Sequence, residues 1–172
     1  MRNRRRPRRP FPQLLRRKRS RRVSSQPPVD DGHCFACGPF NPDGLHLHFE
    51  RDGAGGARAT TVLDAKYQGW AGIAHGGIVM MLLDEAMAHA AGMTGEKGMT
   101  ASVSVRFRAP VPLGSELTLT GKVLWKRRSV LGLEASVQNA AGDILATSEG
   151  SFVTKGPVEK GRLGNLAPGE TV

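Results

Sequence analysis

Two carboxylates and a histidine interrupt the most apolar segment of the chain, residues 75–93: they are Asp84, Glu85 and His89. An ionised carboxylate among apolar side chains is unfavourable unless it is paired or takes part in chemistry. Glu85 and His89 are four positions apart, the spacing of an ordinary polar pair on one face of a helix. We therefore predict that Asp84 is a general base or a nucleophile, and we keep Glu85 as the alternative base.

The run His75-Gly76-Gly77 at the start of the same segment is a second chemical feature. The first N–H groups of a helix have no partner within it and lie at the positive end of its macrodipole. Glycine leaves these groups open to a ligand because it has no side chain. We expect the N–H groups of Gly76 and Gly77 to suit a developing oxyanion on an acyl carbonyl.

Gly76 and Asp84 are too far apart along one helix to act on the same atom. Eight residues at a rise of 1.5 Å each separate them by ~12 Å, whereas a base or nucleophile must come within about 3–3.5 Å of its reacting partner. A second copy of the helix, running antiparallel, would bring its Asp84 to the Gly76 of the first. The spacing thus predicts a homodimer with two composite sites, and it leaves open a homotetramer built as a dimer of dimers.

The elements that must position these groups are one helix and a set of strands. The helix over residues 75–93 has almost no polar face, so we expect it to be buried on all sides. Strands are predicted over residues 45–50, 57–63, 100–108, 116–125, 130–139 and 144–153, with an irregular stretch at 69–72 and turns at 126–128 and 141–143. A sheet can bury such a helix only by wrapping around it. The predicted class is α+β, a hotdog fold with an antiparallel β-sheet wrapped around one long buried helix.

Several motifs fall into one familiar pattern. A histidine, two glycines, six further residues and an aspartate follow one another from His75 to Asp84, directly after the run Tyr67-Gln68-Gly69-Trp70-Ala71-Gly72-Ile73-Ala74. The pattern continues in Met99-Thr100-Ala101, in Arg108-Ala109-Pro110-Val111-Pro112-Leu113-Gly114, and in Cys34-Phe35-Ala36-Cys37-Gly38 with Asn41-Pro42 and Gly44-Leu45. In these motifs the chain resembles the PaaI-type acyl-CoA thioesterases of the hotdog superfamily, over roughly residues 32–155.

The resemblance implies an enzyme that hydrolyses an acyl-CoA thioester to the free acid and CoA, with no cofactor. Asp84 would be the base or nucleophile, and the Gly76 N–H would polarise the thioester carbonyl. His75 would shape the start of the helix, and Thr100 would help to hold the attacking water. Gly69 stands where some relatives carry asparagine, so one polar contact would be absent or supplied from elsewhere.

Substrate binding is expected from four residues: Gly77, Trp70, Arg127 and Arg128. Trp70 and the methionines of the helix would form an adaptable apolar wall. Arg127 and Arg128 belong to a basic turn, and guanidinium groups suit the phosphates of CoA. The alternative function is a non-catalytic hotdog module that binds acyl-CoA, and the intact glycine pair with Asp84 favours the enzyme.

The net charge of +10 does not describe the expected domain. Residues 1–22 hold eleven Arg and one Lys and no acidic residue, so 25 less 12 leaves 13 basic against 15 acidic residues, a net of −2. This distribution excludes a basic nucleic-acid-binding domain, and nucleic acid could be a partner only through the tail. We predict a disordered Arg/Pro-rich tail over residues 1–29, a hotdog domain over 30–156 and a flexible tail over 157–172.

Two cysteines, Cys34 and Cys37, are too few for a disulfide framework and favour reduced thiols in a cytoplasmic protein. A structural zinc site needs four ligands, and the local count reaches only three even when His33 is included. We therefore expect no metal and assign both cysteines to the packing of a small loop. No apolar run approaches the ~18 residues of a membrane span, so no membrane-spanning segment is predicted.

Overall fold

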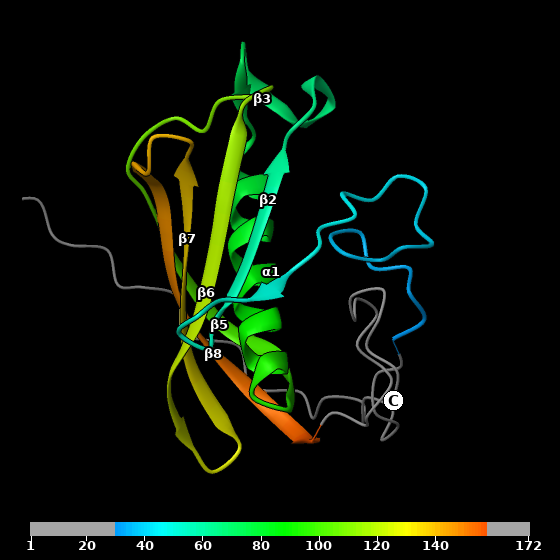
Figure 1. Ribbon diagram of the computed structural model, residues 1–172, viewed down its shortest axis with the longest axis vertical. Helices are drawn as coiled ribbons and strands as arrows, with labels where there is room; N and C mark the ends of the chain where they lie inside the picture. Colours follow the sequence, from blue (N-terminus) through cyan, green and yellow to red (C-terminus); the bar gives the residue numbers. More distant parts are fainter. Residues whose placement is uncertain (1–29, 158–172) are drawn as a thin grey trace, which may run out of the picture.

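The structure of the protein, a computed structural model, describes residues 30–157 (Figure 1). Its elements are β1 (Glu50–Arg51), β2 (Ala57–Val62), a 3-10 helix (Ala65–Tyr67), β3 (Gln68–Trp70), β4 (Ile73–Ala74), α1 (Gly76–Met93), β5 (Glu96–Phe107), β6 (Glu116–Arg127), β7 (Val130–Asn139) and β8 (Ile144–Pro157). The tails expected over residues 1–29 and 157–172, and any binding of nucleic acid by the first of them, lie outside this range, except for Pro157, which ends β8. Among the described residues, no helix has the length and apolar character of a membrane span.

Six strands form one antiparallel sheet in the order β1-β2-β6-β7-β8-β5. The single long helix α1 runs along one side of this sheet (Figure 1) and contacts β2, β5, β6, β7 and β8. The short strands β3 and β4 pair with each other and form a separate hairpin. This arrangement confirms the predicted α+β hotdog fold, and it leaves β5 as an edge strand with one neighbour.

The core lies between α1 and the sheet. The helix contributes Val79, Leu82, Leu83, Ala86, Met87, Ala90 and Ala91, and the largest buried side chains of the sheet are Leu117, Leu119, Leu131, Leu133, Val137 and Phe152. The helical positions recur at intervals of three and four, so they fall on one side of α1. Burial of each large apolar side chain contributes about 1.5–3 kcal/mol, which fixes how α1 is rotated against the sheet.

The opposite side of α1 is open, and here the prediction of a helix buried all round is wrong for the single chain. Met80 is 45% exposed, and Asp84 is half-buried. The sheet covers only one side of the helix, because it ends at β5, where Met99 and Phe107 are 53% and 51% exposed. One chain therefore leaves part of the apolar surface of α1 exposed to solvent.

The segment before β1 is extended without being a strand. Leu47 and Phe49 are buried and alternate with exposed neighbours, as predicted for residues 45–50. The Leu47 N–H, however, donates to the Ala36 carbonyl (2.9 Å), so the preceding loop holds this segment, and pairing with β2 is limited to β1. The predicted strand over 57–63 is β2, which pairs along its full length with β6.

Two predicted irregular segments contain strand. The stretch 69–72 includes the end of β3 and the turn into β4. The basic turn predicted at 126–128 is shorter, because Lys126 and Arg127 continue β6 and Arg128 enters the turn with a φ of 52°. Lys126 and Arg127 pair with residues of β7 in the regular ladder. The side chain of Lys126 also forms an ion pair with Glu96 at the start of β5.

Gly121 marks the closest approach between the sheet and α1, and we predict that Gly121→Ala destabilises the fold. A Cβ atom at this position would lie 2.1 Å from the Ala86 carbonyl oxygen. We expect a loss of about 1–3 kcal/mol in the free energy of unfolding, measured by urea denaturation. Gly53→Ala is the matched control, since a Cβ there meets nothing within 4 Å; equal midpoints for the two variants would contradict this packing.

Candidate active site

The start of α1 is built by His75, which caps the helix. Its backbone is extended (φ −63°, ψ 135°), and its Nδ1 accepts a hydrogen bond from the Gly77 N–H at 3.0 Å. Of the two N–H donors expected for an oxyanion, that of Gly77 is therefore already used. The Gly76 N–H has no acceptor among residues 30–157 and is left as the open donor.

A cleft of about 400 Å³ opens beside Gly76. Its lining is mostly apolar: Trp70, Ile73, Ala74, Gly76, Val79, Phe107, Arg108, Ala109, Pro110 and Val111. The hairpin of β3 and β4 carries Trp70, which is 80% exposed, and a bond from the Ala74 N–H to the Val111 carbonyl (2.9 Å) fixes β4 beside the segment after β5. The fold thus brings the predicted residues Gly76 and Trp70 together.

Close backbone packing explains the glycine at position 69. A Cβ atom there would lie 2.8 Å from the His75 Cα, so a larger residue requires the chain to move apart. The His75 N–H also donates to the Tyr67 carbonyl (2.8 Å) across the same contact. The asparagine that some relatives carry at this position does not fit here, and the polar contact it would make is not available from Gly69.

Asp84 lies two turns further along α1, on its open side. The Thr100 hydroxyl on β5 donates to the Asp84 Oδ1 at 2.8 Å, so the structure brings these two predicted residues together. Burial raises the pKa of the Asp84 carboxyl above its ordinary value, the Thr100 bond offsets part of that rise, and the nearby Glu85 charge adds to it. A half-buried carboxylate with a raised pKa and one fixed oxygen has the properties of a general base.

Glu85 is directed to other partners. Its Oε1 lies 3.2 Å from the His89 Nε2, as predicted for a polar pair, and the His89 ring stacks on Phe49 with centroids 4.4 Å apart. Burial acts to raise the pKa of Glu85, but hydrogen bonds from His89 and Cys37 hold it below its ordinary value. These contacts occupy Glu85 and favour Asp84 as the base.

The basic residues are distributed differently from the prediction. Arg127 and Arg128 lie where β6 turns into β7, and neither lines the cleft beside Gly76. The Lys126–Glu96 pair places this turn near the end of α1 that lies away from Gly76. Arg108 lines the cleft instead, and sequence reasoning did not select it as a binding residue although it begins one of the motifs.

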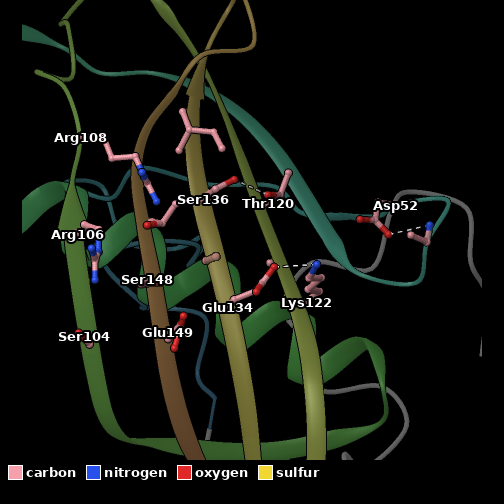
Figure 2. A pocket seen from close by; sticks show the side chains of 15 residues that line it. Asp52, Ser104, Arg106, Arg108, Thr120, Lys122, Glu134, Ser136, Ser148 and Glu149 are labelled. Atoms are coloured by element: carbon pink, nitrogen blue, oxygen red, sulfur yellow. Dashed lines mark hydrogen bonds and ion pairs between the residues drawn. The ribbon is translucent and has the colours of Figure 1, made fainter.

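A larger hollow of about 600 Å³ lies on the other face of the sheet and is polar (Figure 2). Figure 2 shows Arg106 and Arg108 directed into it, together with Glu134 and Glu149 from the neighbouring strands. Lys122 and Glu134 form an ion pair across it at 2.8 Å. Its lining contains neither Gly76 nor Asp84, so its size does not make it the candidate for acyl chemistry.

The comparisons with known proteins agree with this geometry. Residues 71–146 match the thioesterase superfamily. A solved structure of a thioesterase superfamily protein is 34% identical with a TM-score of 0.68, and the match spans 71% of this chain and 63% of that protein. No curated protein is similar enough to this chain to count as a match.

Two further solved structures share the fold at lower identity. A Streptococcus mutans protein bound to acetyl CoA is 21% identical with a TM-score of 0.61, over 66% of this chain and 91% of that one. The E. coli PaaI protein from the phenylacetic acid degradation operon is 22% identical with a TM-score of 0.61, over 66% and 82%. The fold is that of hotdog proteins. Within it, residues 71–146 are similar to the thioesterase superfamily, in agreement with the resemblance to PaaI-type members.

Proposed function

We propose that the protein is an acyl-CoA thioesterase, which hydrolyses a thioester to the free acid and CoA. The observation that carries the proposal is Asp84, a half-buried carboxylate bonded to Thr100, on the same helix whose first N–H opens into an apolar cleft. The family match supports a thioester as the substrate. The structural relative bound to acetyl CoA supports CoA as the carrier of the acyl group.

The proposed reaction uses water as the nucleophile. Asp84 takes a proton from water while the water oxygen bonds to the thioester carbon, and Thr100 keeps the carboxylate oriented. The carbonyl electron pair moves onto its oxygen, where the Gly76 N–H and the helix macrodipole stabilise the negative charge. Collapse of this intermediate breaks the carbon–sulfur bond, and the leaving thiolate recovers the proton from Asp84.

The proposed active unit is a two-fold dimer. Because α1 is continuous from Gly76 to Met93, Asp84 stays ~12 Å from Gly76 along the helix axis. The surfaces that a second copy would cover are the open side of α1 at Met80 and the edge strand β5 with Phe107. An antiparallel second copy would supply Asp84 to the cleft beside Gly76 and would bury this apolar surface.

Recognition of CoA is proposed to depend on Arg108, a residue that lines both the cleft beside Gly76 and the polar hollow. Its guanidinium, which is directed into the hollow (Figure 2), can bind a phosphate in bidentate geometry. Arg127 and Arg128 could contact CoA only from the second chain of the proposed dimer. An antiparallel partner would bring the C-terminal end of its α1, and with it these two residues, close to the cleft beside Gly76.

The experiment that tests the activity is release of CoA thiol from a panel of aryl, short, medium and long acyl-CoAs. We expect hydrolysis of at least one class, with free acid formed in equal amount. Tight binding of acyl-CoA without thiol release from any of them would instead support the non-catalytic binding module.

The Thr100 hydroxyl gives a smaller, separable prediction. Thr100→Val removes the hydrogen bond to Asp84 with little change in shape, whereas Thr100→Ser keeps it. A hydrogen bond to a charged group contributes about 1.5–3 kcal/mol, so we expect kcat to fall roughly 10- to 100-fold in Thr100→Val and only a few-fold in Thr100→Ser. Steady-state hydrolysis measures both, and equal losses in the two variants would remove the hydroxyl from the mechanism.

A further inference from the structure

The loop before β1 folds back onto α1 and brings two thiols to a carboxylate. The Sγ atoms of Cys34 and Cys37 and a carboxylate oxygen of Glu85 all lie within 4.8 Å of one another. Cys34 is exposed, and the other two residues are half-buried. We call this group the thiol–carboxylate cluster. It lies outside the apolar cleft beside Gly76, and the proposed hydrolysis does not use it.

The turn that carries the two cysteines is tightly built. The Gly38 N–H donates to the Cys34 carbonyl at 2.9 Å, and a Cβ on Gly38 would lie 2.3 Å from the Cys34 nitrogen. The Leu45 N–H donates to the Phe35 carbonyl at 2.9 Å, which ties the turn to the extended segment packed on the core. The backbone itself therefore holds both thiols on the side that faces Glu85.

Within the cluster, Glu85 interacts with the Cys37 thiol. Burial, followed by the hydrogen bond and charge of Glu85, raises the pKa of the Cys37 thiol well above its ordinary value. A second acidic residue, Asp30, also acts on Glu85, and His89 is the basic group in contact with it. A divalent cation between the three side chains of the cluster would contact ligand atoms that already lie close together.

We propose that Cys34, Cys37 and Glu85 bind one divalent cation of the zinc type. Two thiolates and a carboxylate are ligands that Zn²⁺ accepts, and the Cys-x-x-Cys spacing is that of zinc sites in proteins. Tetrahedral coordination needs ligand atoms about 3.5–3.8 Å apart, which small rotations of these side chains reach from the observed spacing. Water completes the tetrahedron, and His89 orients Glu85 from outside it.

The cation would join the loop of residues 34–38 to the middle of α1. Glu85 directly follows Asp84 on the helix, so the site would fix the helical turn that carries the proposed base. With three protein ligands, the site would differ from a closed, four-ligand structural zinc site. Its predicted effect is to hold the loop against α1, because metal-binding free energy adds to the stability of the elements it joins. This inference does not depend on the thioesterase proposal, and either can fail without the other.

The test is metal content and cobalt binding of the full chain, purified under reducing conditions without chelators. We expect about one zinc per chain by elemental analysis, and thiolate-to-metal charge transfer with tetrahedral d–d bands when Co²⁺ is added to the metal-stripped protein. Cys34→Ser, Cys37→Ser and Glu85→Gln should each weaken Co²⁺ binding by at least ~10-fold. His33→Ala is the matched control, since His33 is exposed and bonded to Asp31 outside the cluster, and its binding should equal that of the wild type.

Three results would overturn the proposal. The first is that reduced wild-type chain binds neither Zn²⁺ nor Co²⁺ in stoichiometric amount. The second is unchanged Co²⁺ binding in both serine variants, with folding verified by circular dichroism. The third is an intact mass lower by two hydrogens in the protein as isolated, which would assign the cysteines to a disulfide instead. The wild-type titration decides the matter even if a variant does not fold.

Discussion

Asp84→Asn is expected to lower kcat for acyl-CoA hydrolysis by about 10²–10⁴-fold, the usual contribution of a general base. Asparagine keeps the size of the side chain and an oxygen for the Thr100 hydroxyl, but it cannot take a proton from water. Substrate binding should change little, because the acyl cleft is lined by other residues. The measurement is single-turnover and steady-state thiol release with the best substrate of the panel.

Two companion variants make this result specific. Glu116→Gln makes the same chemical change at an exposed position on β6 and should retain wild-type turnover. Glu85→Gln should reduce kcat far less than Asp84→Asn, because His89 and Cys37 already occupy that carboxylate. The reverse order, with near-normal turnover in Asp84→Asn, would make Glu85 the base and remove Asp84 from that role.

Gly76→Pro should reduce kcat by about 10²–10³-fold, the effect of losing one oxyanion donor. Proline has no N–H, and the first helical position tolerates it because that N–H has no partner within the helix. His75 has the extended conformation that a following proline requires. The substitution therefore removes the proposed donor while α1 remains intact, which circular dichroism and the urea midpoint can verify.

Gly76→Ala is the control for the added atoms. Alanine keeps the N–H, and its Cβ would meet Phe107 at 3.6 Å, an ordinary contact. We expect turnover within a few-fold of the wild type for this variant. Equal, large losses in both variants would mean that the space beside Gly76 matters and that its N–H does not act as an oxyanion donor.

The sequence was most informative about the elements whose patterns are local. Predicted residues 75–93 became α1 over Gly76–Met93, and residues 130–139 became β7 without any shift. It was wrong about the burial of α1, because an apolar residue such as Met80 looks the same whether its own chain or another molecule covers it. The apolar pattern of a helix indicates that its side chains are to be buried, but it does not indicate which molecule buries them.

The site was predictable where chemistry follows from spacing and was missed where it depends on tertiary contacts. Asp84 and Thr100 were selected from motifs, and the fold places them 2.8 Å apart. The hydrogen bond from the Gly77 N–H to the His75 ring depends on a rotamer of His75 that the sequence does not specify. The contact between Cys37 and Glu85 joins residues far apart in the chain, so counting nearby ligands such as His33 could not find it.

The central claim is that each active site takes Asp84 from one chain and Gly76 from another. It is tested most directly by a purified heterodimer in which one chain carries Asp84→Asn and the other Gly76→Pro, isolated with two different tags. One of its two composite sites would hold both substitutions and the other neither, so we predict about half of the wild-type turnover per dimer. Turnover no higher than that of the two parent homodimers would contradict the shared site.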